Sequence, residues 1–371
     1  MEISPVTLVV SALKEDRPVI IVDDLGDSLC GYLAMASARI TGEKVSLFVN
    51  LGRGVLLSAI EEKRASRMGI APLGDLSRDP FPLGVGVESR LNITTGISAI
   101  ERAETLRAIA REALANKTSQ SRAIIAPGHV FPLIGKDGGL LVKTGIAEAI
   151  LDLLTITGEE PVGAVMHILG RKGEYSSLDE LRQLSEAGKF PMIFISQIIN
   201  HRLGHEPLIH RVATAKLPTE HFGEFEAHCY VSKHDQGEHL VLSKNIIKNE
   251  DVQKPTLVRM HSERRTGDLF FDEAVPGRLN LLRSMRRIEE EGRGALVYIR
   301  KNKSGFSKGS LDGPGSSVSM PESIVALKEL GVGAQILIDL GITNLRLLTS
   351  TIKSTPDLSA FSLNIHEQIL L

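Results

Sequence analysis

The chain has 371 residues, a length typical of two domains of ordinary size. Lys and Arg number 43 against 45 Asp and Glu, a formal charge of −2, so a broadly basic nucleic-acid-binding surface is not expected. The two cysteines, Cys30 and Cys229, lie far apart without a CxxC spacing, which argues against a disulfide framework and favours a reducing compartment. The apolar run at residues 6–10 is too short to span a bilayer, and no stretch reaches about 18 apolar residues. We expect a soluble cytoplasmic protein that binds neither membrane nor nucleic acid.

Strands and helices alternate through the first half of the chain, a pattern that indicates an α+β or α/β fold. The first apolar run ends in an acidic pair, Asp23 and Asp24, as a buried strand leading into a cleft would. The expected elements are strands at 18–24 and 54–60, helices at 61–67 and 99–114, a rigid turn into a short strand at 127–133, a helix at 145–154 and a strand at 162–169.

A polar stretch at residues 201–207 contains Gly204 and Pro207 and predicts a boundary between domains at 1–205 and 206–371. The segment 301–321 is rich in Gly, Ser and Lys, so we expect a disordered loop there. The remaining expected elements are strands at 209–215, 225–231, 239–242, 257–261, 295–300 and 345–349, and helices at 279–291, 322–330 and 333–340.

Several sequence runs coincide with two known enzyme families. VIIVDD at 19–24, TTGISAIER at 94–102 and PGHVFPL at 127–133 make the first half resemble 3,4-dihydroxy-2-butanone 4-phosphate synthase. VRMHSERRTGD at 258–268 and EEEGRG at 289–294 make the second half resemble GTP cyclohydrolase II. The resemblance implies an α+β protein, with a synthase-like α/β sandwich domain followed by a GTP cyclohydrolase II-like α+β domain. It further implies a homodimer, and the formation of two riboflavin precursors from ribulose 5-phosphate and GTP.

The first domain departs from the family at its magnesium-binding positions. The family's Arg-Glu-Asn-Glu-Gly-Asp run becomes Asp-Ser-Leu-Cys-Gly-Tyr at 27–32, although carboxylates are the ligands that magnesium prefers. Ile146 stands where the family has a metal-binding His, and His167 where it has an acidic residue. Lys143 replaces an Arg, keeping the charge without the bidentate fork.

The second domain departs from the family at its zinc-binding positions. Arg264, Val275 and Gly277 replace the three cysteine thiolates that the resemblance implies. The segment 303–305 replaces a Glu-Gly-Arg element, and a substitute site built from His221, His228, His234 and His239 is not expected. We therefore predict that the magnesium and zinc sites of the family are lost and that the chain has no cofactor.

Other positions remain compatible with ligand binding. Thr94, Thr95, Gly96 and Ser98 lie at a predicted helix N-terminus, where free N–H groups favour a phosphate, although simple helix capping explains them equally well. Lys143 and Arg259 complete the candidates for binding a phosphorylated small molecule, while His261, Glu263 and Asp268 also survive from the family pattern.

Three hypotheses remain open. The first is a pseudoenzyme that binds a ligand or partner, and the second is a repurposed enzyme that acts on a phosphosugar or nucleotide by metal-independent chemistry. The third is residual synthase activity through Asp23, Asp24 and Asp27. The catalytic candidates are Asp23, Asp24, Cys30 and His129; a buried inert cysteine is the commoner alternative for Cys30, for which no base is assignable.

Overall fold

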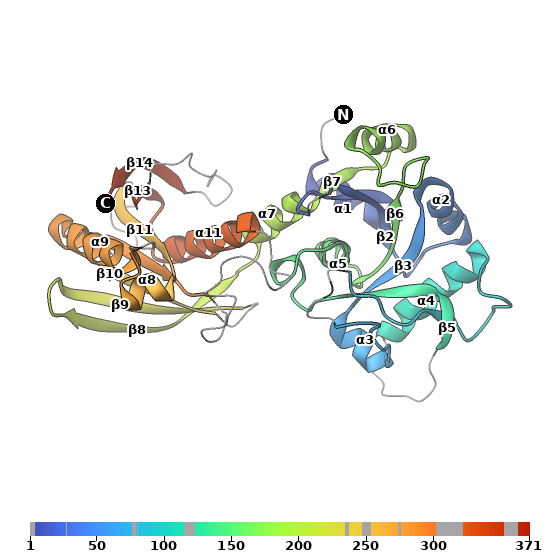
Figure 1. Ribbon diagram of the computed structural model, residues 1–371, viewed down its shortest axis with the longest axis horizontal. Coiled ribbons are helices and arrows are strands. Elements are labelled where there is room, and N and C mark those ends of the chain that lie inside the picture. The colour runs from blue at the N-terminus through green and yellow to red at the C-terminus, as the bar shows by residue number, and fades with distance from the viewer. Residues whose placement is uncertain are drawn as a thin grey trace. The chain divides into compact units, whose positions relative to one another are not determined.

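The computed structural model describes residues 4–26, 28–75, 79, 81–114, 123–233, 237–246, 254–273, 276–301, 322–351 and 363–371. The chain forms two compact units that divide at His201 and Arg202, and each is described by itself (Figure 1). The predicted boundary after residue 205 falls at the end of helix α7, Ile195–His205. In the described ranges, no helix combines the length and the apolar character needed to cross a membrane.

The first unit is built on a seven-stranded mixed sheet with the order β4-β5-β3-β6-β2-β1-β7. Its strands are β1 Val19–Asp23, β2 Cys30–Ala36, β3 Arg53–Glu61, β4 Val87–Ser89, β5 Ile124–Gly135, β6 Val162–Ile168 and β7 Met192–Phe194. Besides α7 and the 3-10 turn η1 at Gly139–Leu141, its helices are α1 Val6–Lys14, α2 Gly42–Gly52, α3 Glu62–Met68, α4 Ala99–Leu114, α5 Ile146–Thr157 and α6 Leu178–Gly188.

Helices cover both faces of this sheet, which makes the unit an α/β sandwich. On β6, Gly163 leaves room for Ile150 of α5, since a Cβ there would lie 2.6 Å from the isoleucine. Met166 points to the opposite face of β6, where its side chain packs against Gly52 of α2. Val19 to Val22 of β1 are fully buried, as expected for a strand covered on both faces.

The second unit contains another seven-stranded sheet, with the order β14-β13-β11-β12-β10-β9-β8. Its strands are β8 Ile209–Thr219, β9 Gly223–Ser232, β10 Glu238–Lys244, β11 Thr256–Ser262, β12 Gly294–Ile299, β13 Asn344–Thr349 and β14 Asn364–Leu370. Its helices are α8 Arg265–Phe270, α9 Gly277–Glu291 and α11 Glu322–Asp339.

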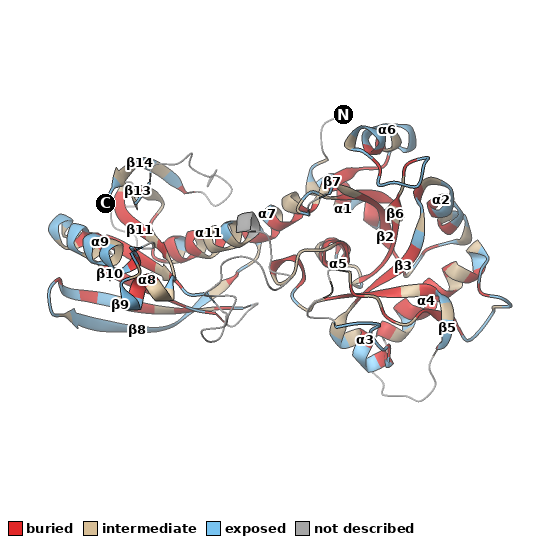
Figure 2. Cartoon of the chain, viewed as in Figure 1, coloured by how far each residue is buried: buried red, intermediate tan, exposed pale blue. Residues whose placement is uncertain are grey.

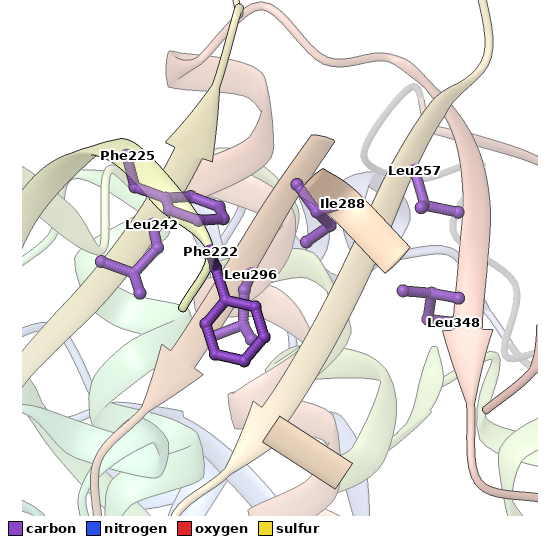
Figure 3. Packing of buried hydrophobic residues seen from close by; sticks show 7 residues of the cluster. All are labelled: Phe222, Phe225, Leu242, Leu257, Ile288, Leu296 and Leu348. Carbon is purple, nitrogen blue, oxygen red and sulfur yellow. The ribbon is translucent and has the colours of Figure 1, made fainter. Parts of the chain in front are cut away.

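The core of the second unit lies between α9 and one face of its sheet. Ile288 of α9 is fully buried and packs among apolar side chains from β9, β10, β11, β12 and β13 (Figure 3). The opposite face of β11 meets α11, because a Cβ at Gly333 would overlap the Met260 side chain. Strand β8 forms the edge of the sheet, and its side chains are almost all exposed.

The predicted fold class is confirmed, but three local expectations are corrected. The PGHVFPL run is not a turn before a short strand, since it lies inside the 12-residue strand β5, paired with β3 and β4. The polar stretch expected at the boundary is largely helical, as the final turns of α7. The two helices expected between 322 and 340 form one helix, α11, because Gly331 and Gly333 allow close packing on Leu203 and Met260 rather than ending it. The loop expected at 301–321 falls almost wholly outside the described residues.

Candidate functional site

Asp23 and Cys30 face each other on adjacent strands of the first unit. They are paired residues of β1 and β2, and two positions further along β2, Tyr32 is paired with His167 of β6. The rings of Tyr32 and Phe81 lie 4.6 and 5.2 Å from the His167 ring, so the imidazole contacts two aromatic side chains. Positions 30, 32 and 167 all differ from the family's pattern. Position 167 is far from the other two in the sequence, and the sheet brings the three side chains together.

Burial sets the protonation of these groups. Removal from water raises the pKa of the Cys30 thiol, with the Asp23 carboxylate adding to the effect, and it raises the pKa of Tyr32. Burial also raises the pKa of Asp23 and lowers the pKa of His167. At neutral pH the cluster therefore presents a thiol, a phenol and a neutral imidazole beside the Asp23 carboxyl group. Among the described residues no cation lowers the pKa of Cys30, so the geometry there does not activate it as a nucleophile.

Asp24 is bonded to the start of helix α7. Its carboxylate accepts hydrogen bonds from the backbone N of Ser196 at 3.1 Å and from Ser196 Oγ at 2.5 Å. Ser196 lies in the first turn of α7, where free N–H groups favour a negative charge. Asp27, the third acidic candidate, lies outside the described residues.

The positions around α5 carry different chemistry from the family's. Ile146 is the first residue of α5 and is buried, so an apolar side chain fills the place of a metal-binding imidazole. The Lys143 ammonium donates to the backbone oxygen of Asp79 at 2.8 Å, and burial lowers its pKa. Glu148 is also buried and accepts a hydrogen bond from the backbone N of Lys136 at 2.8 Å, while burial raises its pKa.

The threonine-rich loop before α4 binds an internal carboxylate. Glu101 Oε1 accepts hydrogen bonds from the backbone N of Thr94 and from Thr94 Oγ1, the latter at 2.7 Å. Glu101 Oε2 accepts from the Ser98 N and Oγ at 3.3 and 2.8 Å. These donors, the backbone N–H of Thr94 first among them, lower the pKa of Glu101 to about 2. Thr95 is exposed. The N–H and hydroxyl donors of the loop thus favour an anion, and the Glu101 carboxylate already accepts hydrogen bonds from most of them.

His129 lies beside this loop. Its Nδ1 contacts the Glu88 carboxylate of β4, and a Cβ at Gly96 would overlap the same carboxylate. Sequence reasoning missed Glu88, which no local pattern marks, and it missed Glu101, which the Ser98-x-x-Glu101 capping-box spacing could have revealed. His129 on β5 is separated from Asp23 on β1 by three intervening strands, so the four catalytic candidates do not converge within this unit.

A second polar cluster lies at the start of α8 in the other unit. Asp268 Oδ1 accepts a hydrogen bond from His261 Nε2 at 2.9 Å, and Oδ2 accepts from the Arg264 backbone N at 2.9 Å and the Tyr298 hydroxyl at 2.8 Å. The rings of His261 and Tyr298 are stacked at 5.4 Å. A Cβ at Gly277 would overlap Asp268 Oδ1, so the carboxylate fills the space in front of this glycine. Sequence reasoning did not identify Tyr298.

Arg259 and His261 lie on the same face of β11 and leave polar atoms unpaired. Arg259 Nη1 donates to the Leu348 backbone oxygen at 3.0 Å, while its Nε and His261 Nδ1 are buried without a partner among the described residues. Burial lowers the pKa of both side chains. Arg259 belongs to a different unit from Thr94 and Lys143.

The described residues contain no group of three or more His, Cys, Asp or Glu side chains able to hold a metal ion. His228 bonds to Thr214 and Ser243 across neighbouring strands, and His239 accepts from the Arg300 backbone, so both have structural partners. Val275 and His234 lie outside the described residues.

Comparison with known proteins assigns both halves of the chain to families. The family model of 3,4-dihydroxy-2-butanone 4-phosphate synthase matches residues 7–201, and that of GTP cyclohydrolase II matches residues 210–370. Riboflavin biosynthesis protein RibBA of Bacillus cytotoxicus is 34% identical over 374 residues, covering 97% of this chain and 91% of its own length. RibBA of Bacillus cereus is likewise 34% identical, over 370 residues with the same coverage.

Two solved structures add detail to the family assignment. RibBX of A. baumannii, a two-domain 3,4-dihydroxy-2-butanone 4-phosphate synthase, matches with a TM-score of 0.75 and 25% identity, covering 99% of both chains. A 3,4-dihydroxy-2-butanone 4-phosphate synthase in complex with two magnesium ions matches 55% of this chain and 98% of its own, with a TM-score of 0.50 and 25% identity.

The prediction that this chain has no cofactor is wrong for a member of these families, because a relative of its first domain binds magnesium. The described side chains around Asp23 fit magnesium poorly, since Ile146 offers no lone pair, Asp24 is bonded to Ser196, and no group of three metal-binding side chains forms among the described residues. The family models and the two relatives at 34% identity agree over nearly the whole chain, and the chain belongs to the family of fused 3,4-dihydroxy-2-butanone 4-phosphate synthase and GTP cyclohydrolase II proteins of riboflavin biosynthesis.

Proposed function

We propose that this chain is a pseudoenzyme of its family, which binds a ligand or partner and catalyses neither parental reaction. The observation that carries the proposal is the cluster of Asp23, Cys30, Tyr32 and His167. The resemblance implies carboxylates that move protons during enolisation of the sugar, and a general base works best with a pKa near the working pH. Cys30 and Tyr32 both have raised pKa values and stay protonated, so neither supplies a base. Asp23 has the one carboxyl group among the four side chains of the cluster.

The second domain supports the same proposal. The Asp268 carboxylate is used by His261, Tyr298 and the start of α8, and it occupies the space that a side chain at position 277 needs. A buried carboxylate with three donors is a stable cross-link, which favours a structural role for this cluster over the ring-opening of GTP.

We further propose that the first domain binds a phosphorylated small molecule beside Thr95 and His129. The hydrogen bonds that converge on Glu101 support a local potential that suits an anion. Thr95 and His129 are exposed next to that loop, and the His129 side chain is 46% exposed. A phosphate there would contact Thr95 and His129 at the surface and would not replace the Glu101 carboxylate.

We also propose that the chain forms a homodimer and that it lies in the cytoplasm. Leu91, Ile97 and Ile100 are 67%, 55% and 74% exposed near the β4 edge, more apolar surface than an isolated domain usually leaves there. Sedimentation of the full chain tests the dimer: Ile100→Glu should give a monomer, whereas an unchanged sedimentation coefficient would remove Ile100 from the interface.

The proposal is tested by measuring formate release from ribulose 5-phosphate and from GTP, with magnesium and zinc both supplied. The resemblance implies that both parental reactions expel formate, so a single formate assay serves both domains. We expect no formate above the rate without protein, while RibBA of Bacillus cereus, run in parallel, supplies the positive control. Formate from either substrate would refute the proposal for that domain.

A second candidate function is residual synthase activity, which the name of the two-domain synthase RibBX favours. In that case Asp23 is the acid–base group that remains in the cluster, with His167 as the neutral imidazole beside it. Asp23→Asn should then abolish formate release from ribulose 5-phosphate, whereas Asp179→Asn, an exposed carboxylate on α6, should leave it unchanged.

A further inference from the structure

Helices α8 and α9 leave large apolar side chains exposed. Phe270 and Phe271 at the end of α8 are each 66% exposed, and Leu279 and Leu282 on α9 are 47% and 38% exposed. Soluble proteins seldom expose a cluster of large apolar side chains without a binding role. We name the α8–α9 face by six residues: Phe270, Phe271, Leu279, Leu282, Arg283 and Arg286.

Arginines surround the exposed leucines of α9. The helix segment 277–288 carries four arginines and no carboxylate, and its outward side is exposed (Figure 2). Arg283 lies one turn beyond Leu279, and Arg286 one turn beyond Leu282, so leucine and arginine alternate along this side. Within the described part of the chain, Arg283, Arg286 and Arg287 form no ion pair or hydrogen bond, which leaves their charges available to a partner.

Helix stability does not explain this arrangement of charge. A helix favours acidic groups at its N-terminus and basic groups at its C-terminus, yet α9 has Arg278 in its first turn and Glu289 to Glu291 at its end. Two of these glutamates are paired with strands: Glu289 contacts Lys244, and Glu291 contacts Arg346 at 2.7 Å. The basic first half of α9 has no such internal partner for Arg283 or Arg286, and so its charge pattern indicates an external one.

We infer that the α8–α9 face binds a protein segment that presents acidic side chains on an apolar surface. Apolar side chains of such a segment would cover Phe270, Phe271, Leu279 and Leu282, and its carboxylates would pair with Arg283 and Arg286. Arginine and aromatic residues are the side chains most enriched at the centres of protein interfaces, and a guanidinium pairs with a carboxylate through two parallel hydrogen bonds. The inference goes beyond the proposed function and does not depend on it.

An acidic protein segment fits better than a membrane or a nucleic acid. The face carries carboxylates as well as arginines, since Asp272 and Glu273 directly follow Phe271 in the chain. An anionic bilayer or nucleic acid responds to charge summed over a Debye length of about 10 Å, and Asp272 and Glu273 would repel it. A folded or helical protein segment instead contacts individual arginines and avoids the neighbouring carboxylates.

The test uses the full chain and a fluorescent helical peptide of about four turns, with leucines and glutamates at i, i+4 spacing. Fluorescence anisotropy should show binding that weakens as salt rises from about 50 to about 300 mM. The double variant Arg283→Glu/Arg286→Glu should weaken binding by about tenfold or more, and so should Leu279→Ser/Leu282→Ser. Arg67→Glu/Arg171→Glu, which changes two exposed arginines of the first unit, should leave binding unchanged.

Several results would overturn the inference. Equal binding of a peptide with lysines in place of the glutamates would refute the charge complementarity between the peptide and the two arginines. Binding of phosphatidylserine vesicles or of single-stranded RNA in preference to the acidic peptide would assign the face to those partners instead. A change from dimer to monomer in Arg283→Glu/Arg286→Glu would show that the face joins two copies of the chain.

Two controls keep the experiment interpretable. Circular dichroism should show a folded double variant, because Arg283 and Arg286 are exposed and bond to no described residue. The formate assay is read separately on the same proteins, so activity in that assay would refute the pseudoenzyme proposal while leaving the peptide result intact.

Discussion

Asp268 is predicted to be a main stabilising residue of the second unit. Its carboxylate is buried and accepts three hydrogen bonds, from His261, the Arg264 backbone and Tyr298. Hydrogen bonds to a charged acceptor contribute about 1.5 to 3 kcal/mol each, and they are not additive within one cluster. Asp268→Ala removes both acceptor oxygens and leaves three donors without their acceptor, for an expected loss of about 3 to 5 kcal/mol in the free energy of unfolding.

Asp268→Asn is the milder change. The amide keeps one oxygen, which can still accept from the Arg264 backbone and Tyr298, while its NH₂ group would face His261 Nε2. The imidazole can accept this hydrogen bond only by moving its proton to Nδ1, a buried atom without a partner. We expect a loss of about 2 to 3 kcal/mol in the free energy of unfolding, smaller than that of Asp268→Ala.

Gly277 supplies a matched double-mutant cycle. In the wild type, Gly277→Ala should destabilise strongly, because the added Cβ overlaps Asp268 Oδ1. In the Asp268→Ala background that oxygen is absent, so the same change should cost less by about 1 kcal/mol or more. Some cost should remain, since the Asp268 backbone N would still lie 3.1 Å from the added carbon.

The assay is urea unfolding followed by far-UV circular dichroism, with the two units fitted as separate transitions because a two-domain chain need not unfold in one step. Hydrogen exchange measured by mass spectrometry then assigns the affected transition to β11, α8 and α9. Additive effects of Gly277→Ala and Asp268→Ala, within about 0.5 kcal/mol, would refute the contact between them. A loss below about 1 kcal/mol for Asp268→Ala would refute the role of these three hydrogen bonds in stabilising the second unit.

The remaining predictions concern protonation and the two clusters of the first unit. Burial lowers the pKa of His261 in the folded state, so its contribution to stability is present above the unfolded value of about 6.5 and is lost as pH falls through the folded value; urea midpoints between pH 5 and pH 7 measure this, and His261→Gln should flatten the dependence. The Glu101 pKa of about 2 means that its stabilisation is present above about pH 4.5 and is lost towards pH 2, which acid titration followed by circular dichroism detects. Glu101→Gln should lower the melting temperature, and inorganic phosphate should raise the melting temperature of this variant more than that of the wild type; no difference would count against an anion-favouring loop. The raised pKa of Cys30 predicts alkylation by iodoacetamide at pH 7 more slowly than for a free thiol of pKa about 8.5, with Cys30→Ser separating its signal from that of Cys229; faster modification would mean an activated thiolate.

Local sequence patterns predicted much of the framework. Apolar runs located β1, β3 and β6, and periodicity with polar caps located α4, because these signals depend on residues within a few positions of one another. The Ser98 and Glu101 spacing also lies within one helical turn, so the capping of the threonine loop was available from the sequence. The gapless runs of family residues determined the fold class for the same reason, since each run has its own local signature.

Tertiary structure alone decided what the acidic side chains do. Asp23 and Asp24 are neighbours in the chain, yet Asp23 is paired with Cys30 of the adjacent strand β2, while Asp24 bonds to Ser196, 172 positions away. Asp268 meets Tyr298 only because the parallel register of β11 and β12 pairs His261 with Tyr298. Strand pairing and helix docking join residues that are distant in sequence, and a carboxylate takes its pKa and its role from the donors that this folding brings within hydrogen-bonding distance. The sequence by itself therefore determined the family and most of the elements, and the tertiary structure decided which polar groups are bonded internally and which remain exposed for a partner.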